Sequence, residues 1–152
     1  MDTSTAEYPA GRSGYSFGTA LKLPFEQAVE LTKGALKTEG FGVLTAIDVR
    51  QTMREKLDIE FEPYVILGAC NPALAHRALT AEPELGLLLP CNVVVHEHDG
   101  ITAVSIVDPV QMLGFVGDNP EVSTVAAEAA AKLRRVITAL ERSPEAPTAA
   151  TA

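Results

Sequence analysis

Pro63-Tyr-Val-Ile-Leu-Gly-Ala-Cys-Asn-Pro72 is the stretch that decides the fold of this chain. Residues 64–69 form an uninterrupted apolar run of strand length, which is typical of a strand inside a sheet. Asn71 and Pro72 then combine a helix-capping side chain with a proline suited to the first helical turn. The stretch therefore predicts a central strand that leads directly into a helix.

A second stretch, Leu87-Leu-Leu-Pro-Cys-Asn-Val-Val-Val95, repeats the combination of an extended run with a cysteine followed by an asparagine. Beyond it, Asp99-Gly100 is the signal of a two-residue type I′ hairpin joining strands 92–98 and 101–107. One face of this hairpin is aliphatic and is expected to meet helices, with the side chains of Val93, Val95, Val104 and Ile106. The opposite face is half apolar, with Val94, His96, His98, Ala103 and Val107, and is a candidate for coverage by another subunit.

The remaining elements follow from hydrophobic spacing and from capping residues. We expect strands at 15–23 and 41–47, a helix from Pro24 that stops at Gly40, a short helix at 49–57, and a last helix from Pro120. Phe41, Val43, Thr45 and Ile47 are expected on one strand face, and Asp108-Pro109 is interpreted as a turn. The last helix is expected to bury Val122, Val125, Ala126, Ala129, Leu133, Ile137 and Leu140.

The order of elements is β-α-β-(α)-β-α-β-β-α, which predicts a single α+β domain. Its sheet is expected to be mainly antiparallel, with the helices on one face. The domain is assigned to residues 15–141. Residues 1–14 are interpreted as a flexible N-terminal arm and residues 142–152, rich in Pro, Ala and Thr, as a disordered tail.

Composition narrows the functional classes. Of the 152 residues, 47% are hydrophobic, which is enough for one domain with a core. The net charge of the chain is −8. An acidic chain without a basic cluster is not expected to bind nucleic acid. It shows no signal-peptide pattern and no apolar run of the roughly 20 residues that a membrane helix needs. We therefore expect a soluble cytoplasmic protein with its two cysteines reduced.

The two cysteine-containing stretches also carry a family resemblance. Residues 68–79 and 82–95, with the upstream segment 39–49, closely resemble the domain-of-unknown-function family 302. The resemblance spans about residues 15–141. It implies an α+β fold similar to that of the TATA-binding protein, in small bacterial or archaeal proteins that are often dimeric and have no settled activity. Ala46 stands where the family pattern leads us to expect a glutamate.

The candidate site is formed by Cys70, Asn71, Cys91, Asn92 and Asp48, provided that adjacent strands bring the two cysteine corners together. Free N–H groups at the helix start would then favour an anion, and a thiol there could act as a nucleophile or soft ligand. The alternative is structural. Both cysteines would be small buried residues, both asparagines turn formers, and the aspartate a helix cap.

The pair His96-x-His98 places two imidazoles on one strand face. Zinc requires three or four ligands, and the only other histidine, His76, lies on a helix, so we predict no metal and no other cofactor.

The sequence as a whole supports two functional hypotheses. One is a domain that binds a small anionic or thiol-reactive molecule, with enzymatic activity left open. The other is a non-enzymatic homodimeric interaction or scaffold module.

Overall fold

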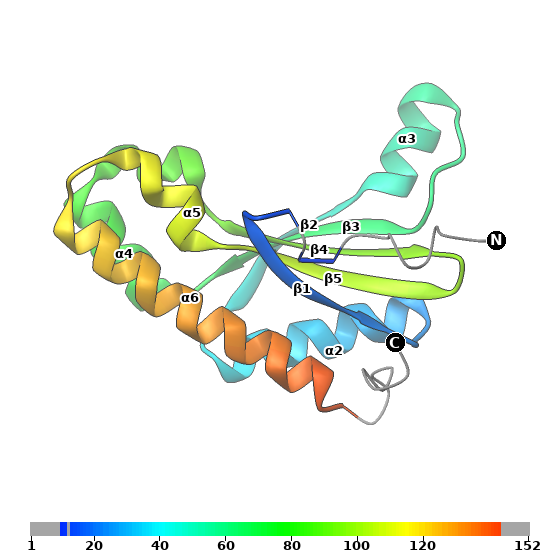
Figure 1. Ribbon diagram of the computed structural model, residues 1–152. Helices are drawn as coiled ribbons and strands as arrows, with labels where there is room; N and C mark the ends of the chain where they lie inside the picture. Colours follow the sequence, from blue (N-terminus) through cyan, green and yellow to red (C-terminus); the bar gives the residue numbers. More distant parts are fainter. Residues whose placement is uncertain (1–9, 12, 144–152) are drawn as a thin grey trace.

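A computed structural model describes residues 10–11 and 13–143 of the chain (Figure 1). Most of the predicted arm, 1–14, and of the predicted tail, 142–152, lies outside the described residues. The elements in chain order are β1 (Ser16–Leu21), α2 (Phe25–Thr38), β2 (Gly42–Asp48), α3 (Val49–Leu57), β3 (Tyr64–Cys70), α4 (Pro72–Ala81), η1 (Pro83–Leu88), β4 (Cys91–His98), β5 (Ile101–Val107), α5 (Pro109–Leu113), η2 (Gly114–Val116) and α6 (Pro120–Glu141).

The strands form one sheet in the order β1-β5-β4-β3-β2, and every neighbouring pair is antiparallel. β3 lies between β4 and β2, which confirms that the decisive stretch is an interior strand. The β4–β5 hairpin pairs His98 with Ile101, as predicted. Both of its turn residues have positive φ, 52° at Asp99 and 81° at Gly100, as a type I′ turn requires.

One face of the sheet is covered by α2 and α6, while no long helix among the described residues lies on the other (Figure 1). The covered face buries alternate residues of the inner strands, as the period of a strand dictates. The last helix buries all seven residues expected of it, together with Ala130 and Val136. Thr102 is buried on this face as well, and its hydroxyl donates to the Leu23 carbonyl at 2.7 Å. The α+β prediction, with its mainly antiparallel sheet, is confirmed.

Short polar side chains begin four of the helices. The Oδ1 atom of Asn71 accepts from the Leu74 amide at 3.2 Å, and that of Asn119 accepts from the Val122 amide at 3.3 Å. Asp48 caps α3 in the same way. Asp108 caps α5, so the interpretation of Asp108-Pro109 as a simple turn was wrong. The sequence there is the same acid-or-amide plus proline signal that starts α4 and α6.

Two features of the β2–α3 region were not expected. A bulge between Val43 and Thr45 shifts the register of β2, so these residues pair with Ala69 and Gly68 and point to opposite faces. The prediction of one continuous face was therefore wrong. α3 projects beyond the sheet (Figure 1) and buries none of its residues. No helix in the described part of the chain is long and apolar enough to cross a membrane.

Candidate functional site

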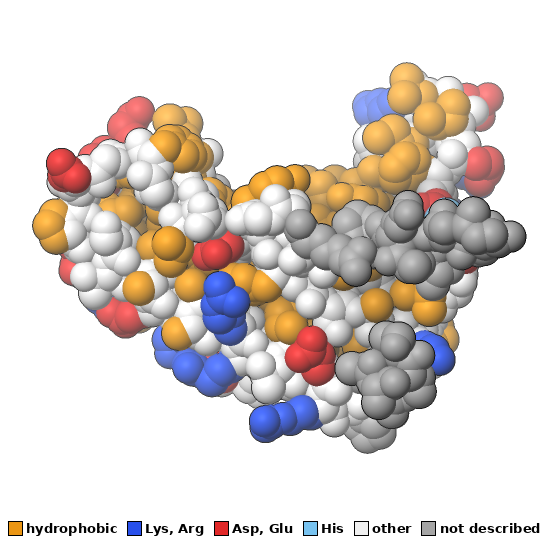
Figure 2. Space-filling model, in the orientation of Figure 1, with side chains coloured by type: hydrophobic (Ala, Val, Ile, Leu, Met, Phe, Trp, Pro, Cys, Tyr) orange, Lys and Arg blue, Asp and Glu red, His pale blue; other side chains and the backbone are white. Residues whose placement is uncertain are grey.

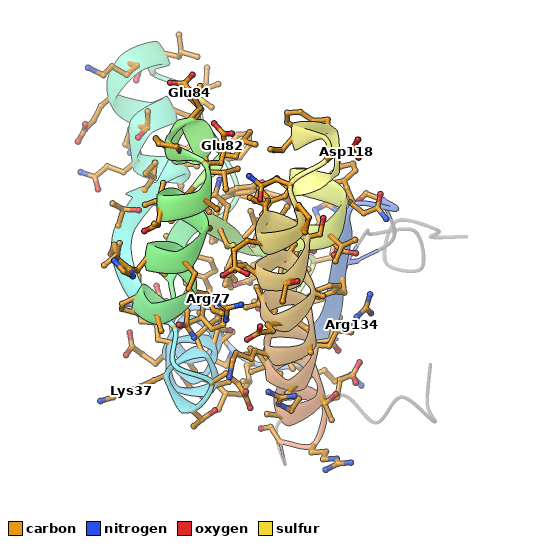
Figure 3. All side chains as sticks on the ribbon, turned by 90° about the vertical axis from the view of Figure 1, so that its left-hand side faces the viewer. Lys37, Arg77, Glu82, Glu84, Asp118 and Arg134 are labelled. Carbon is orange, nitrogen blue, oxygen red and sulfur yellow. The ribbon has the colours of Figure 1, made fainter. Side chains whose placement is uncertain are left out.

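A pocket lies at the end of the sheet where β3 finishes and β4 begins. Its volume is about 270 Å³. α4 and α6, which lie side by side in Figure 3, supply two of its walls, and α5 and the turn before β4 supply others. The lining includes Leu74, Ala78, Pro90, Leu113, Val125 and Ala126.

The lining is almost entirely apolar, and none of the described residues that form it carries a charge. Small side chains make room for the pocket, because both helices line it with alanines. These are Ala75 and Ala78 on α4, and Ala126 and Ala129 on α6. Two other lining residues are well exposed, Leu44 at 67% and Leu79 at 38%. The pocket therefore reaches the surface at these leucines. The exposure of Leu79 follows from its place at this opening.

Both cysteines line this pocket. Cys91 pairs with Ala69, the residue before Cys70, so both cysteines stand at the end of the sheet that the pocket occupies. Cys91 is buried and Cys70 is half-buried. Burial raises the pKa of Cys91 from 9.0 to about 11, with a smaller contribution from the charge of Cys70. The Cys91 thiol is therefore neutral at physiological pH, which argues against its use as a thiolate nucleophile.

Asn71 also lines the pocket, but its polar atoms are engaged elsewhere. Its Oδ1 atom caps α4, and its Nδ2 atom donates to the Glu39 carbonyl at 3.4 Å. Gly40, at φ +84°, lies directly against this amide, since a Cβ there would be 3.0 Å from Nδ2. Asn71 therefore ties the end of α2 to the start of α4. This contact matches the turn-forming alternative and leaves little polar capacity for an anion.

Asn92 and Asp48 do not line this pocket. Asn92 follows Cys91 on the same strand, so its side chain points to the other face of the sheet, where it borders a separate groove. Asp48 ends β2 opposite Val65, at the far end of β3, and caps α3. The predicted meeting of five residues is therefore corrected to three: Cys70, Asn71 and Cys91. Their role in ligand binding stays a prediction.

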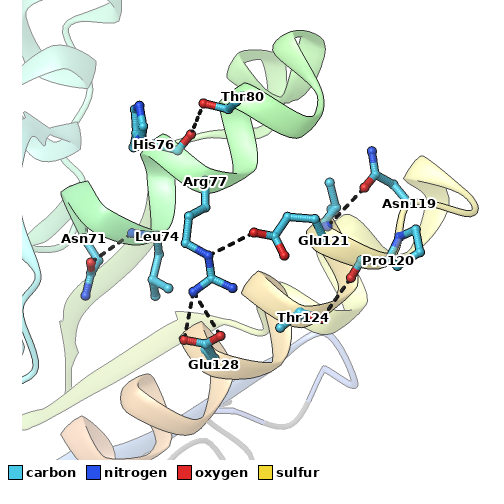
Figure 4. A network of polar contacts seen from close by, with 11 residues as sticks. Asn71, Leu74, His76, Arg77, Thr80, Asn119, Pro120, Glu121, Thr124 and Glu128 are labelled. Atoms are coloured by element: carbon cyan, nitrogen blue, oxygen red, sulfur yellow. Dashed lines mark hydrogen bonds and ion pairs between the residues drawn. The ribbon is translucent and has the colours of Figure 1, made fainter.

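An ion-pair clamp holds the two helical walls of the pocket together (Figure 4). Arg77 of α4 donates from Nε to Glu121 at 3.0 Å and from Nη1 to Glu128 at 3.1 Å, both on α6. These bonds raise the pKa of the guanidinium, and the bond to Glu121 has the larger effect. A planar guanidinium suits two carboxylates because its donors have fixed directions. Its partners lie 44 and 51 residues further along the chain, so no local spacing in the sequence indicates these ion pairs.

The histidines of β4 face away from the pocket. His96 stacks near Tyr64, with ring centroids 5.1 Å apart, while His98 contacts Glu62 and lies 3.3 Å from a carboxylate oxygen of Asp99. Within residues 10–11 and 13–143, no group of three or more His, Cys, Asp or Glu side chains is arranged to hold a metal ion.

Comparisons with known proteins agree on one family. A family model described as "Domain of unknown function DUF302" matches residues 17–140. The chain is similar to a crystal structure of the uncharacterized conserved protein DUF302 from Bacillus stearothermophilus, with 30% sequence identity and a TM-score of 0.75. That match covers 82% of this chain and 96% of the other. No curated protein matches the chain.

Proposed function

The chain belongs to the DUF302 family of unknown function, and we propose that the pocket at the end of its sheet binds a small, largely apolar molecule. One observation carries this proposal: a pocket of about 270 Å³ with an uncharged, aliphatic lining that reaches the surface. Apolar concave sites of this kind are the usual places where small molecules bind proteins.

The size of the pocket indicates the size of the ligand. An engineered cavity of roughly 150 Å³ in an unrelated lysozyme binds benzene. A pocket of about 270 Å³ accommodates a molecule with a second ring or a short alkyl chain. Indole is a suitable probe because it is neutral, flat and bicyclic. A ligand with nine heavy atoms in an apolar site is expected to bind with a Kd between about 10 µM and 1 mM.

The hypothesis that the ligand is an anion receives less support. No charged side chain lines the pocket, and the Asn71 side chain is engaged in capping α4. A bare anion would lose its hydration without gaining a charged partner, which is costly. A thiol-reactive ligand remains compatible with the site, because Cys70 is half-buried and lines the pocket. Cys91, held as a neutral thiol, is a weak nucleophile.

Alkylation of the folded chain with N-ethylmaleimide tests this proposal. Saturating indole is expected to slow labelling of Cys70 about tenfold, because at ten times its Kd indole leaves roughly one pocket in eleven empty. Cys91 is expected to react about a hundredfold more slowly than an ordinary thiol, since a pKa of about 11 in place of 9.0 lowers the thiolate fraction by that factor. Peptide mass spectrometry separates the two sites.

The chain unfolded in urea provides the control, because both cysteines should then react alike whether or not indole is present. Labelling of Cys70 at the same rate with and without indole in the folded chain would contradict the proposal. Fast labelling of Cys91 at pH 7 would contradict the burial of its thiol.

A second candidate function is that of a homodimeric interaction module, and the α3 arm, residues 47–61, favours it. α3 has no buried residue, yet the arm exposes Ile47, Leu57, Ile59 and Phe61, and Leu57 is 62% exposed. Hydrophobic side chains gather over this region in Figure 2. A nine-residue helix is marginal without packing against something else. A second copy of the chain covering the arm would provide that packing.

Replacing Leu57 by glutamate is expected to convert a dimer into a monomer, because the substitution places a charge in the apolar interface. Light scattering coupled to size exclusion measures the mass directly. Leu87→Glu is the matched control, since Leu87 is 80% exposed but lies outside the α3 arm. A wild-type chain that is monomeric at all concentrations tested, or a dimer that survives Leu57→Glu, would remove this candidate.

A further inference from the structure

The uncovered face of the sheet carries a second hollow, separate from the apolar pocket. This open-face groove has a volume of about 370 Å³. Its lining combines aliphatic side chains, Val94, Ile106 and Val107, with polar and aromatic ones. The polar and aromatic residues are Tyr15, Ser16, Tyr64, Asn92, His96 and Ser105. The sequence predicted Asn92 to be part of the site with the two cysteines, but in the structure Asn92 lines this groove instead.

The register of the strands explains why these groups meet. Val94 pairs with Ser105 of β5, and Asn92 and His96 flank it on the same face of β4. His96 pairs in turn with Tyr64 of β3, and the two rings lie 5.1 Å apart at an interplanar angle of 37°. Val94 therefore forms an apolar floor, with an amide on one side and a pair of rings on the other.

The outer wall of the groove is held in place by a close backbone contact. A Cβ on Gly11 would lie 2.1 Å from the Gly18 nitrogen, so two glycines are needed for this segment to lie against β1. Gly11 also has φ +76°, which glycine adopts without strain. Further along, the Tyr15 carbonyl accepts from the Asp108 amide at 2.8 Å. These contacts fix Tyr15 and Ser16 at the edge of the groove.

The chemistry of the lining selects a class of ligand. No Asp, Glu, Lys or Arg lies among the described lining residues. Desolvation lowers the pKa of His96, against an opposing effect of Glu62, so its imidazole is neutral at pH 7. The Asn92 amide and the Ser105 hydroxyl can each donate and accept a hydrogen bond. The Ser16 hydroxyl, which is paired with the Ser13 hydroxyl at 2.7 Å, can make a further one, and the ring pair offers a flat apolar surface.

We propose that the open-face groove is a second ligand site, which binds a neutral, flat heteroaromatic molecule bearing an amide-type donor and acceptor. Asn92 pairs with the amide group of the ligand, Ser105 and Ser16 satisfy the remaining polar atoms, and the ring lies over Val94 beside Tyr64. This site is independent of the apolar pocket, because the two share no lining residue among those described.

Nicotinamide is the probe for this proposal, since it is neutral at pH 7 and joins a flat ring to a carboxamide. Titration of the ¹⁵N-labelled full chain is expected to give saturable shifts of the backbone amides of Asn92, Val94 and Ser105. Asn92→Ala is expected to weaken binding at least tenfold, and Tyr64→Leu to weaken it similarly by removing one ring. Asn92 is exposed, so its replacement should leave the fold intact.

Gln27→Ala is the matched control, because it removes an exposed side-chain amide on α2, outside the groove, and should leave nicotinamide affinity unchanged. Shifts that stay linear in nicotinamide concentration would overturn the proposal, as would shifts confined to α4 and α6. Equal losses of nicotinamide affinity in Asn92→Ala and Gln27→Ala would also overturn the proposal. Indole binding to the apolar pocket should survive Asn92→Ala, so failure of one site is distinguishable from failure of the other.

Discussion

Replacing Gly68 by alanine is expected to destabilise the protein by about 1–3 kcal/mol, the usual cost of adding a methyl group where there is no room. A Cβ at this position would lie 2.3 Å from Oγ1 of Thr45 and 2.8 Å from Cγ of Pro90. The threonine side chain can rotate, but the proline ring can retreat only if the start of β4 moves with it. Urea unfolding measures the change in the free energy of unfolding.

Gly42→Ala is the matched control for this substitution. Gly42 lies on the adjacent strand, and a Cβ there would meet nothing within 4 Å. Alanine also reduces the freedom of the unfolded chain, so this variant is expected to be neutral or slightly stabilised. Equal effects of the two substitutions would show that Gly68 is not closely packed. Because Pro90 lines the apolar pocket, Gly68→Ala is also expected to weaken indole binding.

Replacing Ala126 by phenylalanine is expected to lower indole affinity at least tenfold while the chain remains folded. Ala126 is buried on α6 and lines the apolar pocket, so a benzyl group there occupies the space that the ligand needs. The chain has no tryptophan, so the fluorescence of added indole can be followed without interference. A shift of indole emission to shorter wavelength reports its transfer from water to an apolar site.

Ala127→Phe is the control for that experiment, because Ala127 is the next residue on α6 and is exposed. It adds the same aromatic surface outside the pocket and should leave indole affinity unchanged. If both variants bind indole as the wild type does, the ligand does not enter the pocket. Circular dichroism of both variants separates loss of the site from loss of the fold.

Local signals in the sequence were enough to predict most of the elements. The cap-plus-proline pairs at Asn71 and Asn119, and the Asp99-Gly100 turn, act through contacts within three residues, so their outcome does not depend on the rest of the fold. The same signal is present at Asp108, where it starts α5. The bulge near Leu44 was not predictable in this way, because it depends on how β2 pairs with β3, where the Thr45 side chain lies against Gly68.

The site was predicted only in part, for a similar reason. The sequence predicted a shared site for Cys70 and Cys91 only on condition that their strands are neighbours, and in the structure both line one pocket. The alternation of side chains along a strand predicts that Asn92 faces away from the apolar pocket, because Asn92 directly follows Cys91. The contribution of α6 to the pocket could not be predicted in this way, because Ala126 and Ala129 reach the pocket only through tertiary packing that no local pattern specifies.

The most direct test of the account is to locate bound indole by intermolecular nuclear Overhauser effects in a complex with the isotope-labelled chain. Binding in the apolar pocket predicts contacts from the indole protons to the methyl groups of Leu74, Leu113 and Val125. Contacts confined to the exposed leucine and isoleucine side chains of the α3 arm, or none at saturating indole, would contradict it.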